Sequence, residues 1–180
     1  MKSLKGQLLI SSAGLYDQNF RHTVVLLADH SAEGAVGVVL NRPLDVTLED
    51  AVPPLAPLGG AAEPLFQGGP VEPASAVLLA ELSRPELADV LAFGAVGFLV
   101  GNVSAEIETA ILRARVYAGY AGWGAGQLEA EMAEHAWILE PAREEDVFTD
   151  APELLWSRVL RRKGGEYAQL SKVPFDPTMN

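Results

Sequence analysis

The sequence predicts a single domain that mixes strands and helices and is not a doubly wound parallel sheet. The chain has 180 residues, close to the usual size of one domain and long enough to bury a self-sufficient core. Short runs rich in Val, Ile and Leu dominate its first half, whereas helical and strand patterns alternate in its second half. Residues 1–180 are therefore expected to fold as one unit.

Three apolar runs in the first half predict strands, because each run is short and is bounded by turn residues. They cover residues 7–11, 23–28 and 35–40. The six residues between the second and third runs suit a hairpin connection, so these two strands are expected to be antiparallel.

A brief helix and a long loop are expected next. Residues 47–50 begin with Thr47, a good N-cap residue, and Pro53 and Pro54 stop the helix. Residues 51–62 are rich in Ala, Pro and Gly and are nearly uncharged. They are therefore expected to form a loop whose length indicates function or mobility.

Strands and helices alternate after this loop. Strand patterns occupy residues 65–67 and 76–82, on either side of a turn at residues 68–70. Ser104 can cap a helix in which Ile107 and Ile111 lie four residues apart. The remaining elements, in chain order, are a strand at residues 115–118, a glycine-rich turn at 119–126, a helix that contains Leu128 and Met132, a strand at 137–139 and a helix at 152–163.

The composition excludes several classes of protein. The chain has no cysteine, which removes thiol chemistry, iron–sulfur clusters, disulfides and cysteine-ligated zinc. A formal net charge of −11, from 24 acidic residues against 13 Lys and Arg, disfavours nucleic acid as a partner. The apolar run at residues 8–10 is too short for a signal peptide, and the uncharged stretch at 90–105 is too short to span a membrane. We therefore expect a cytoplasmic protein without a membrane partner.

The glycine-rich stretch at residues 119–126 is the first candidate binding element. A turn between a strand and a helix exposes backbone N–H groups that can hold phosphate. The stretch does not match GxGxxG, because Gln127 takes the place of the third glycine, and no Lys-Ser or Lys-Thr completes a P-loop. The helix that follows also carries several glutamates, which repel an anion. The alternative is a tight turn in which glycine permits close packing around Trp123.

A rigidly placed arginine is the second candidate. Asn41 and Arg42 end the third predicted strand, and Pro43 holds Arg42 extended, so its guanidinium can grip a carboxylate or a phosphate. Arg21 precedes the second predicted strand in a similar way. The alternative for both arginines is a structural role, in which they bind backbone carbonyls or one of the many carboxylates.

No catalytic or metal site stands out in the sequence. The three histidines form no HxH or HExxH pattern, so we expect no bound metal. No GxSxG motif marks a nucleophilic serine, and no pair among the 24 carboxylates can be chosen as acid and base from the sequence alone. We therefore name no catalytic residue and expect no cofactor.

A basic patch lies on the last predicted helix. Arg158, Arg161 and Arg162 fall on one side of it, and apolar residues fall on the other. Cations near a helix C-terminus complement its dipole, so capping explains the patch. The functional alternative is a docking point for an acidic partner.

Four sequence blocks stand out in combination. They are residues 6–10 with 19–25 (GQLLI and NFRHTVV), residues 37–43 (GVVLNRP), residues 68–71 (GGPV) and residues 119–131 (GYAGWGAGQLEAE). In this order and spacing the chain resembles the YqgE/AlgH family of small bacterial proteins. The resemblance implies a compact α+β fold, with a bifurcated, partly barrel-like mixed sheet surrounded by helices. Members are often labelled transcriptional regulators, but the resemblance implies no assigned biochemical activity.

Two positions depart from the family's pattern. Ala13 stands where many members have a proline after the first strand, and Ala80 stands where many have a histidine. If that histidine has a chemical role elsewhere in the family, this chain lacks it.

The motif residues that remain predict one ligand site, because polar groups at strand ends and helix starts commonly bind ligands. Its members are Asn41, Arg42, Gly68, Gly69, Gly124, Gly126, Gln127 and Glu131. The leading expectation is a non-enzymatic cytoplasmic regulator that binds a small anionic ligand or a protein partner. The alternative is a hydrolase or nucleotide-processing enzyme, in which Arg42 and the turn at 119–126 cradle an anion and Glu131 acts as base. A DNA-binding regulator is the third expectation.

Overall fold

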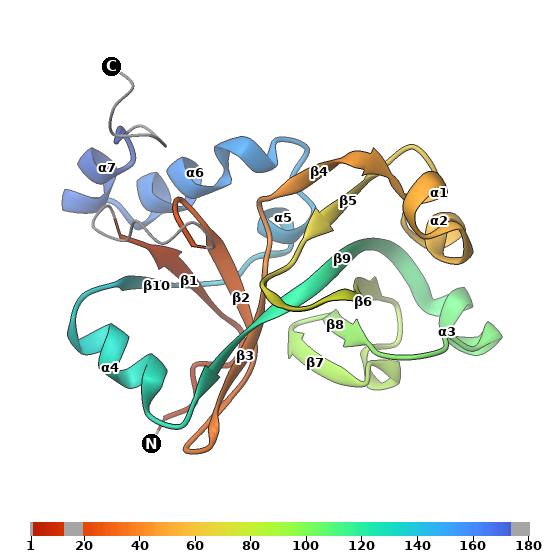
Figure 1. Cartoon of the computed structure of the whole chain (residues 1–180), viewed down its shortest axis with the longest axis horizontal. Coiled ribbons are helices and arrows are strands. Elements are labelled where there is room, and N and C mark those ends of the chain that lie inside the picture. The colour runs from red at the N-terminus through yellow and green to blue at the C-terminus, as the bar shows by residue number, and fades with distance from the viewer. Residues whose placement is uncertain (1, 13–19, 174–180) are drawn as a thin grey trace.

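The computed structural model describes residues 2–12 and 20–173 (Figure 1). Its strands are β1 Gln7–Ser11, β2 Val24–Ser31, β3 Gly34–Val39, β4 Pro43–Thr47, β5 Pro64–Gln67, β6 Val71–Leu82, β7 Val90–Phe93, β8 Val96–Leu99, β9 Ile111–Gly124 and β10 Trp137–Pro141. Its α-helices are α1 Leu48–Ala51, α2 Ala56–Gly59, α3 Ala105–Ala110, α4 Gln127–Ala133, α5 Glu144–Val147, α6 Leu155–Lys163 and α7 Glu166–Leu170.

The strands form one large sheet that forks at β9. The main path runs β10-β1-β2-β3-β9-β6-β8-β7, and neighbours along it are antiparallel. On the side of β9 away from β6, β5 pairs with residues 117–118 in the parallel direction, whereas β3 pairs with residues 121–124. β4 then pairs with β5, so two branches leave the same strand. The bifurcated mixed sheet of the predicted α+β fold is therefore confirmed.

One part of the sheet curls toward a barrel. β2 lies against β7 without pairing with it. The strands β2, β3, β9, β6, β8 and β7 consequently surround a common interior, although the sheet is not closed (Figure 1). Helices lie around the sheet, with α6 and α7 near one end and α1, α2 and α3 near the other.

The core occupies both faces of the sheet. On β1, Leu8 and Ile10 pack in the same cluster as Trp156 of α6, whereas Leu9 packs on the opposite face with Trp123. Burial on both faces explains why the first strands are continuous apolar runs rather than alternating ones. A third cluster packs α1, α2 and α3 against β6 and β9.

Several predicted elements are confirmed. β2 and β3 form the expected antiparallel hairpin. β2 extends three residues beyond its predicted end and β3 begins one residue early, so only residues 32–33 connect them. Thr47 caps α1, because its hydroxyl accepts the Asp50 N–H at 3.3 Å. Ser104 caps α3 in the same way, by accepting the Ile107 N–H at 3.3 Å.

The prediction of a plain loop at residues 51–62 is wrong in part. This segment contains α2, whose first turn includes a proline, as helix starts tolerate. The sequence pattern also does not predict β4, β7 or β8. The hairpin of β7 and β8 turns at Gly94, whose φ of +49° suits glycine, and a second glycine, Gly97, interrupts the apolar pattern of β8.

The glycine-rich stretch is a strand rather than a turn. β9 continues to Gly124, so only Ala125 and Gly126 connect it to α4. Residues 121–124 pair with residues 34–37 of β3. The predicted exposed turn at 119–126 is therefore corrected, because its backbone lies largely in the sheet.

Of the two positions that depart from the family pattern, Ala13 and Ala80, the structure describes only Ala80. Ala80 is fully buried on β6, so this departure lies in the core. Ala13 lies outside the described residues. Among the helices that the structure describes, none has the length and apolar character needed to cross a membrane.

Candidate functional site

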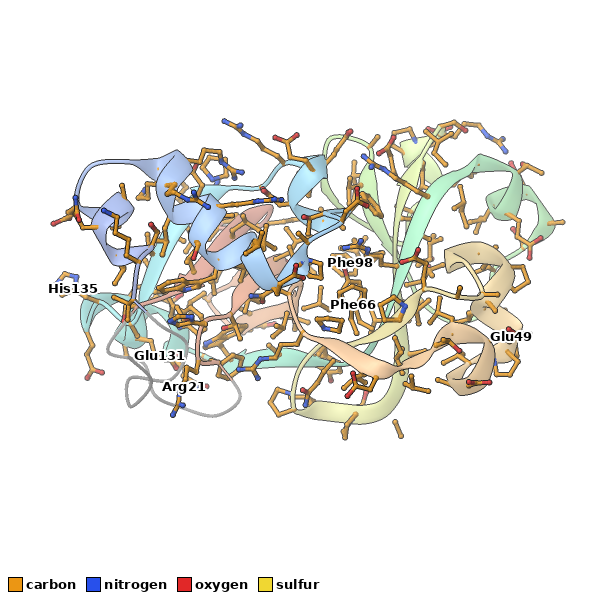
Figure 2. The ribbon with its side chains drawn as sticks, turned by 90° about the horizontal axis from the view of Figure 1, so that it is seen from above. Arg21, Glu49, Phe66, Phe98, Glu131 and His135 are labelled. Atoms are coloured by element: carbon orange, nitrogen blue, oxygen red, sulfur yellow. The ribbon has the colours of Figure 1, made fainter. Side chains whose placement is uncertain are left out.

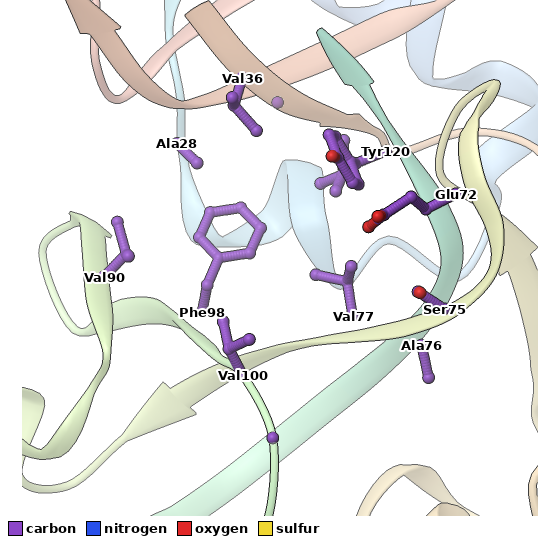
Figure 3. A pocket seen from close by; sticks show the side chains of 13 residues that line it. Ala28, Val36, Glu72, Ser75, Ala76, Val77, Val90, Phe98, Val100 and Tyr120 are labelled. Atoms are coloured by element: carbon purple, nitrogen blue, oxygen red, sulfur yellow. The ribbon is translucent and has the colours of Figure 1, made fainter.

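A groove opens into the barrel-like part of the sheet (Figure 3). It has a volume of about 470 Å³ and receives side chains from each of the six strands that curl together. We call it the barrel groove. Its main apolar side chains are Val36, Val77, Val90, Phe98, Val100 and Tyr120.

Strand alternation places these side chains in the groove. Along β3, Ala35 is buried in the cluster with Trp123, whereas the next side chain, Val36, reaches the groove and is 41% exposed. Val100, directly after β8, is 66% exposed at the groove. Two open valines at one cavity form an apolar surface that a ligand can cover.

Few polar side chains face the barrel groove. Glu72 is the one charged residue among those that line it, and Ser75 and Tyr120 supply hydroxyl groups. Figure 3 shows the Glu72 carboxylate turned into the space beside Tyr120 and Val77. Among the described contacts, no hydrogen bond or ion pair engages this carboxylate.

A bulge in β6 holds Glu72 at the groove. The register with β9 passes from Val71 opposite Tyr120 to Ala76 opposite Ala118, so four residues of β6 stand opposite one residue of β9. Glu72 itself has a φ of +46°, a strained conformation for a residue with a side chain. Bulges and strained residues of this kind commonly redirect side chains at binding sites.

Asn41 and Arg42 lie in a different cavity, of about 280 Å³, between the end of β3 and the start of α6. The Asn41 side chain accepts the Val24 N–H at 3.0 Å and donates to the His22 carbonyl at 2.8 Å. Arg42 donates from Nη2 to the Arg21 carbonyl at 3.0 Å. Both side chains therefore have structural contacts with the segment that precedes β2.

His22 and Trp156 form one wall of this second cavity. Their rings stack with centroids 3.7 Å apart, and His22 has a φ of +50°. Burial, and secondarily the charge of Arg21, lower the pKa of His22. Trp156 donates from its indole N–H to the Ser11 carbonyl at 2.9 Å, which fixes the ring against β1.

Gly68 and Gly69 allow the chain to cross β9 at close range. The Gly68 N–H donates to the Ala118 carbonyl at 2.8 Å. A Cβ atom on Gly68 would lie 2.2 Å from the Gly119 carbonyl oxygen, and one on Gly69 would lie 2.2 Å from the Tyr120 backbone. These glycines thus permit the backbone contact that sets β6 beside β9.

Gly124, Gln127 and Glu131 form a hydrogen-bonded network at the start of α4. Gln127 accepts the Gly124 N–H at 3.0 Å and donates to Glu131 at 3.0 Å. Glu131 also accepts the indole N–H groups of Trp123 at 3.1 Å and Trp137 at 2.9 Å. Figure 2 shows Glu131 well apart from Phe98, which lines the barrel groove.

The eight predicted site residues therefore do not line one cavity. Asn41 and Arg42 share the cavity beside α6, the two glycines at 68–69 cross β9, and the rest of the set, Gly126 included, lies at the start of α4. A ligand role for these residues remains a prediction. The described contacts give structural roles to Asn41, Gln127 and Glu131.

The three arginines of the predicted basic patch also differ in their surroundings. Arg158 and Arg161 are exposed, but the Arg162 side chain is only 17% exposed. Arg162 donates to both oxygens of Asp146, at 2.7 and 2.9 Å, and to Glu140 at 3.1 Å. These carboxylates raise the pKa of Arg162. Arg162 is thus engaged within the protein, and docking of an acidic partner at the three arginines remains a prediction.

The sequence analysis does not single out the groove residues. Glu72 and Ser75 lie just before the strand predicted at residues 76–82, and Tyr120 lies in the stretch interpreted as a turn. The apolar groove residues come from six separate strands and form no linear motif. The alternating exposure that identifies a groove wall becomes visible only once the strands are paired.

The chain matches the model of the AlgH-like family over residues 8–168. A UPF0301 protein of Streptomyces coelicolor is 41% identical over 187 aligned residues, which cover 100% of this chain and 97% of that one. A UPF0301 protein of Chlorobaculum tepidum is 39% identical, with 97% and 95% covered.

Two solved structures share the fold. The solution structure of the AlgH protein from Pseudomonas aeruginosa has a TM-score of 0.72 and 30% identity, and the match covers 95% of this chain and 94% of that one. A crystal structure of a protein from Corynebacterium diphtheriae has a TM-score of 0.86 at 24% identity, with 96% and 93% covered, and shows a likeness of fold.

Proposed function

The chain belongs to the AlgH-like family, and from this premise we propose that it is a non-enzymatic regulator that binds an apolar ligand in the barrel groove. The observation that carries the proposal is the groove itself. Its volume of about 470 Å³ lies within the range of small-molecule sites, and such sites occur at the mouths of barrels. Its wall is formed mainly by valine and aromatic side chains, with few polar groups, as binding sites usually are.

The chemistry of the groove favours binding over catalysis. General acid–base catalysis requires positioned titratable groups, commonly a pair whose pKa values are pushed apart. Among the lining residues, Glu72 and Tyr120 are the only titratable side chains. Ser75 is the one serine among them, and no hydrogen bond among the described contacts joins its hydroxyl to the Glu72 carboxylate, as an activated nucleophile requires.

The alternatives named from the sequence receive less support. The enzyme hypothesis requires free amides in the stretch at 119–126, but residues 121–124 pair with β3, and the Gly124 N–H donates to Gln127. The DNA-binding hypothesis requires the basic patch, and Arg162 already binds two carboxylates. An anionic ligand at Arg42, or an acidic partner at Arg158 and Arg161, remains a prediction for a surface distinct from the groove.

A neutral fluorescent probe tests the proposed function. N-Phenyl-1-naphthylamine is expected to bind the protein with increased fluorescence, because the groove removes its rings from water. The double variant Val36→Gln and Val100→Gln is expected to weaken binding by about tenfold, through loss of apolar contact area. Both valines are exposed enough for the fold to tolerate the change.

Leu112→Gln is the matched control, because Leu112 is 60% exposed and does not line the groove. This variant is expected to bind the probe as the unchanged protein does. Equal loss in the control and the double variant, or no loss in either, would contradict the proposal.

A further inference from the structure

We infer that the barrel groove selects an organic cation, a small molecule with a protonated amine on an apolar body. This inference rests on the proposed function and names its ligand class. The class differs from the anion predicted for Arg42, because Arg42 is not among the residues that line the groove.

Charge in the groove is negative and lacks an internal partner. Glu72 is the one charged lining residue, and among the described contacts no arginine, lysine or hydrogen-bond donor engages its carboxylate. Asp89, which does not line the groove, differs because it accepts the Val100 N–H at 2.7 Å. Glu72 is exposed, so its carboxylate stays hydrated and charged at the mouth of the groove. An ammonium group bound there would make a charge-assisted hydrogen bond with it.

The aromatic rings of the groove also favour a cation. Figure 3 shows Tyr120 and Glu72 side by side, with the Phe98 ring on the opposite side of the groove. Ring faces attract cations, and they also pack against hydrocarbon. An ammonium group near Glu72 with a hydrocarbon body over Phe98 would therefore use both kinds of surface.

The backbone conformation of β6 holds Glu72 at the groove. The residue is held at a φ of +46° on the β6 bulge and is followed by Pro73, which limits the backbone before it. Strained side-chain-bearing residues tend to occur where the side chain has a task. In Glu72 the strained backbone and the unengaged carboxylate coincide at one cavity.

The size of the cavity favours a small molecule as the occupant. Its volume of about 470 Å³ lies in the lower part of the range for drug-sized ligands, and six strands surround it. The negative net charge of −11 also attracts cations to the protein as a whole. The preference for a cation in the groove must therefore be measured against a charge-changing control at another site.

Three probes with one hydrocarbon body test the inference by calorimetric titration of the full chain: 4-phenylbutylammonium, 4-phenylbutanol and 4-phenylbutyrate. The cation is expected to bind about threefold more tightly than the alcohol, because the ion pair that it makes with the exposed Glu72 carboxylate is screened by water. The carboxylate is expected to bind more weakly than the alcohol, because it repels Glu72. Glu72→Gln is expected to remove these differences while the affinity for the alcohol is kept.

Glu49→Gln is the control for net charge. Glu49 lies on α1, far from Phe98 in Figure 2, and is exposed. This variant is expected to keep the preference for the cation. If the three probes bind equally, or if Glu72→Gln keeps the preference, the inference is overturned while the proposed function stands. If no probe binds and the neutral fluorescent probe also fails, both are overturned.

Discussion

Gly69→Ala is expected to lower the free energy of unfolding by about 4 kcal/mol, from backbone strain and overpacking together. Gly69 has a φ of +153°, and a Cβ atom there would lie 2.2 Å from both the carbonyl carbon and oxygen of Tyr120. Because the obstacle is backbone, it cannot move aside as a flexible side chain would. Urea unfolding followed by tryptophan fluorescence measures the loss.

Gly126→Ala separates the steric effect from the effect of backbone conformation. Gly126 has a φ of +76°, but nothing beyond its chain neighbours lies within 4 Å of the position that a Cβ atom would take. The expected loss is therefore about 1 kcal/mol, from conformation alone. Losses of the same size in both variants would show that the close crossing of Gly69 over β9 is not a major constraint on the fold.

Arg162→Met is expected to lower the free energy of unfolding by about 3–5 kcal/mol. The Asp146 side chain is only 3% exposed, so removal of its partner leaves a carboxylate with little access to water. The neighbouring Arg161 provides the matched control, because it is exposed and makes no ion pair among the described residues. Arg161→Met is expected to change stability by less than about 0.5 kcal/mol.

A double variant tests the mechanism of this loss. Arg162→Met combined with Asp146→Asn removes both charges and keeps an oxygen that can accept the Arg143 N–H, a contact of 2.8 Å in this structure. The double variant is expected to be more stable than Arg162→Met alone. If the double variant is less stable than Arg162→Met, the loss does not come from the uncompensated carboxylate of Asp146.

The strands of the first half could be predicted because their burial is local in sequence. β1 and β2 are apolar on both faces, so short runs such as residues 7–11 carry the signal by themselves. The helix caps at Thr47 and Ser104 were equally readable, since each depends on one hydroxyl group and an N–H three residues later.

The predicted turn at residues 119–126 was wrong because glycine occurs both in turns and in strands that pack closely. In residues 119–124 glycines alternate with larger residues such as Tyr120 and Trp123, and the pattern is typical of turns in an isolated sequence. In the fold Gly119 permits a close strand crossing, since a Cβ atom there would lie 2.5 Å from the Gly69 carbonyl oxygen, whereas Gly122 and Gly124 lie in the strand without such a close contact. Only the paired partner strands distinguish these cases.

The candidate site was harder to predict than the fold. The motif residues were identified as polar groups at element ends, but Asn41 and Glu131 have most of their hydrogen-bonding capacity engaged within the protein. The groove residues are mainly apolar, and in the sequence their valines cannot be distinguished from core valines. What marks Val36 and Val100 is their exposure at one cavity, a property of tertiary structure.

Intermolecular NOE measurement on valine-methyl-labelled protein tests the central claim most directly. With N-phenyl-1-naphthylamine bound, the account predicts NOEs from the probe to the methyl groups of Val36, Val77 and Val100, which line the barrel groove. It predicts none to Val159, which lies on the buried face of α6 and does not line the groove. Binding of the probe with no NOE to any of the three groove valines would contradict the account.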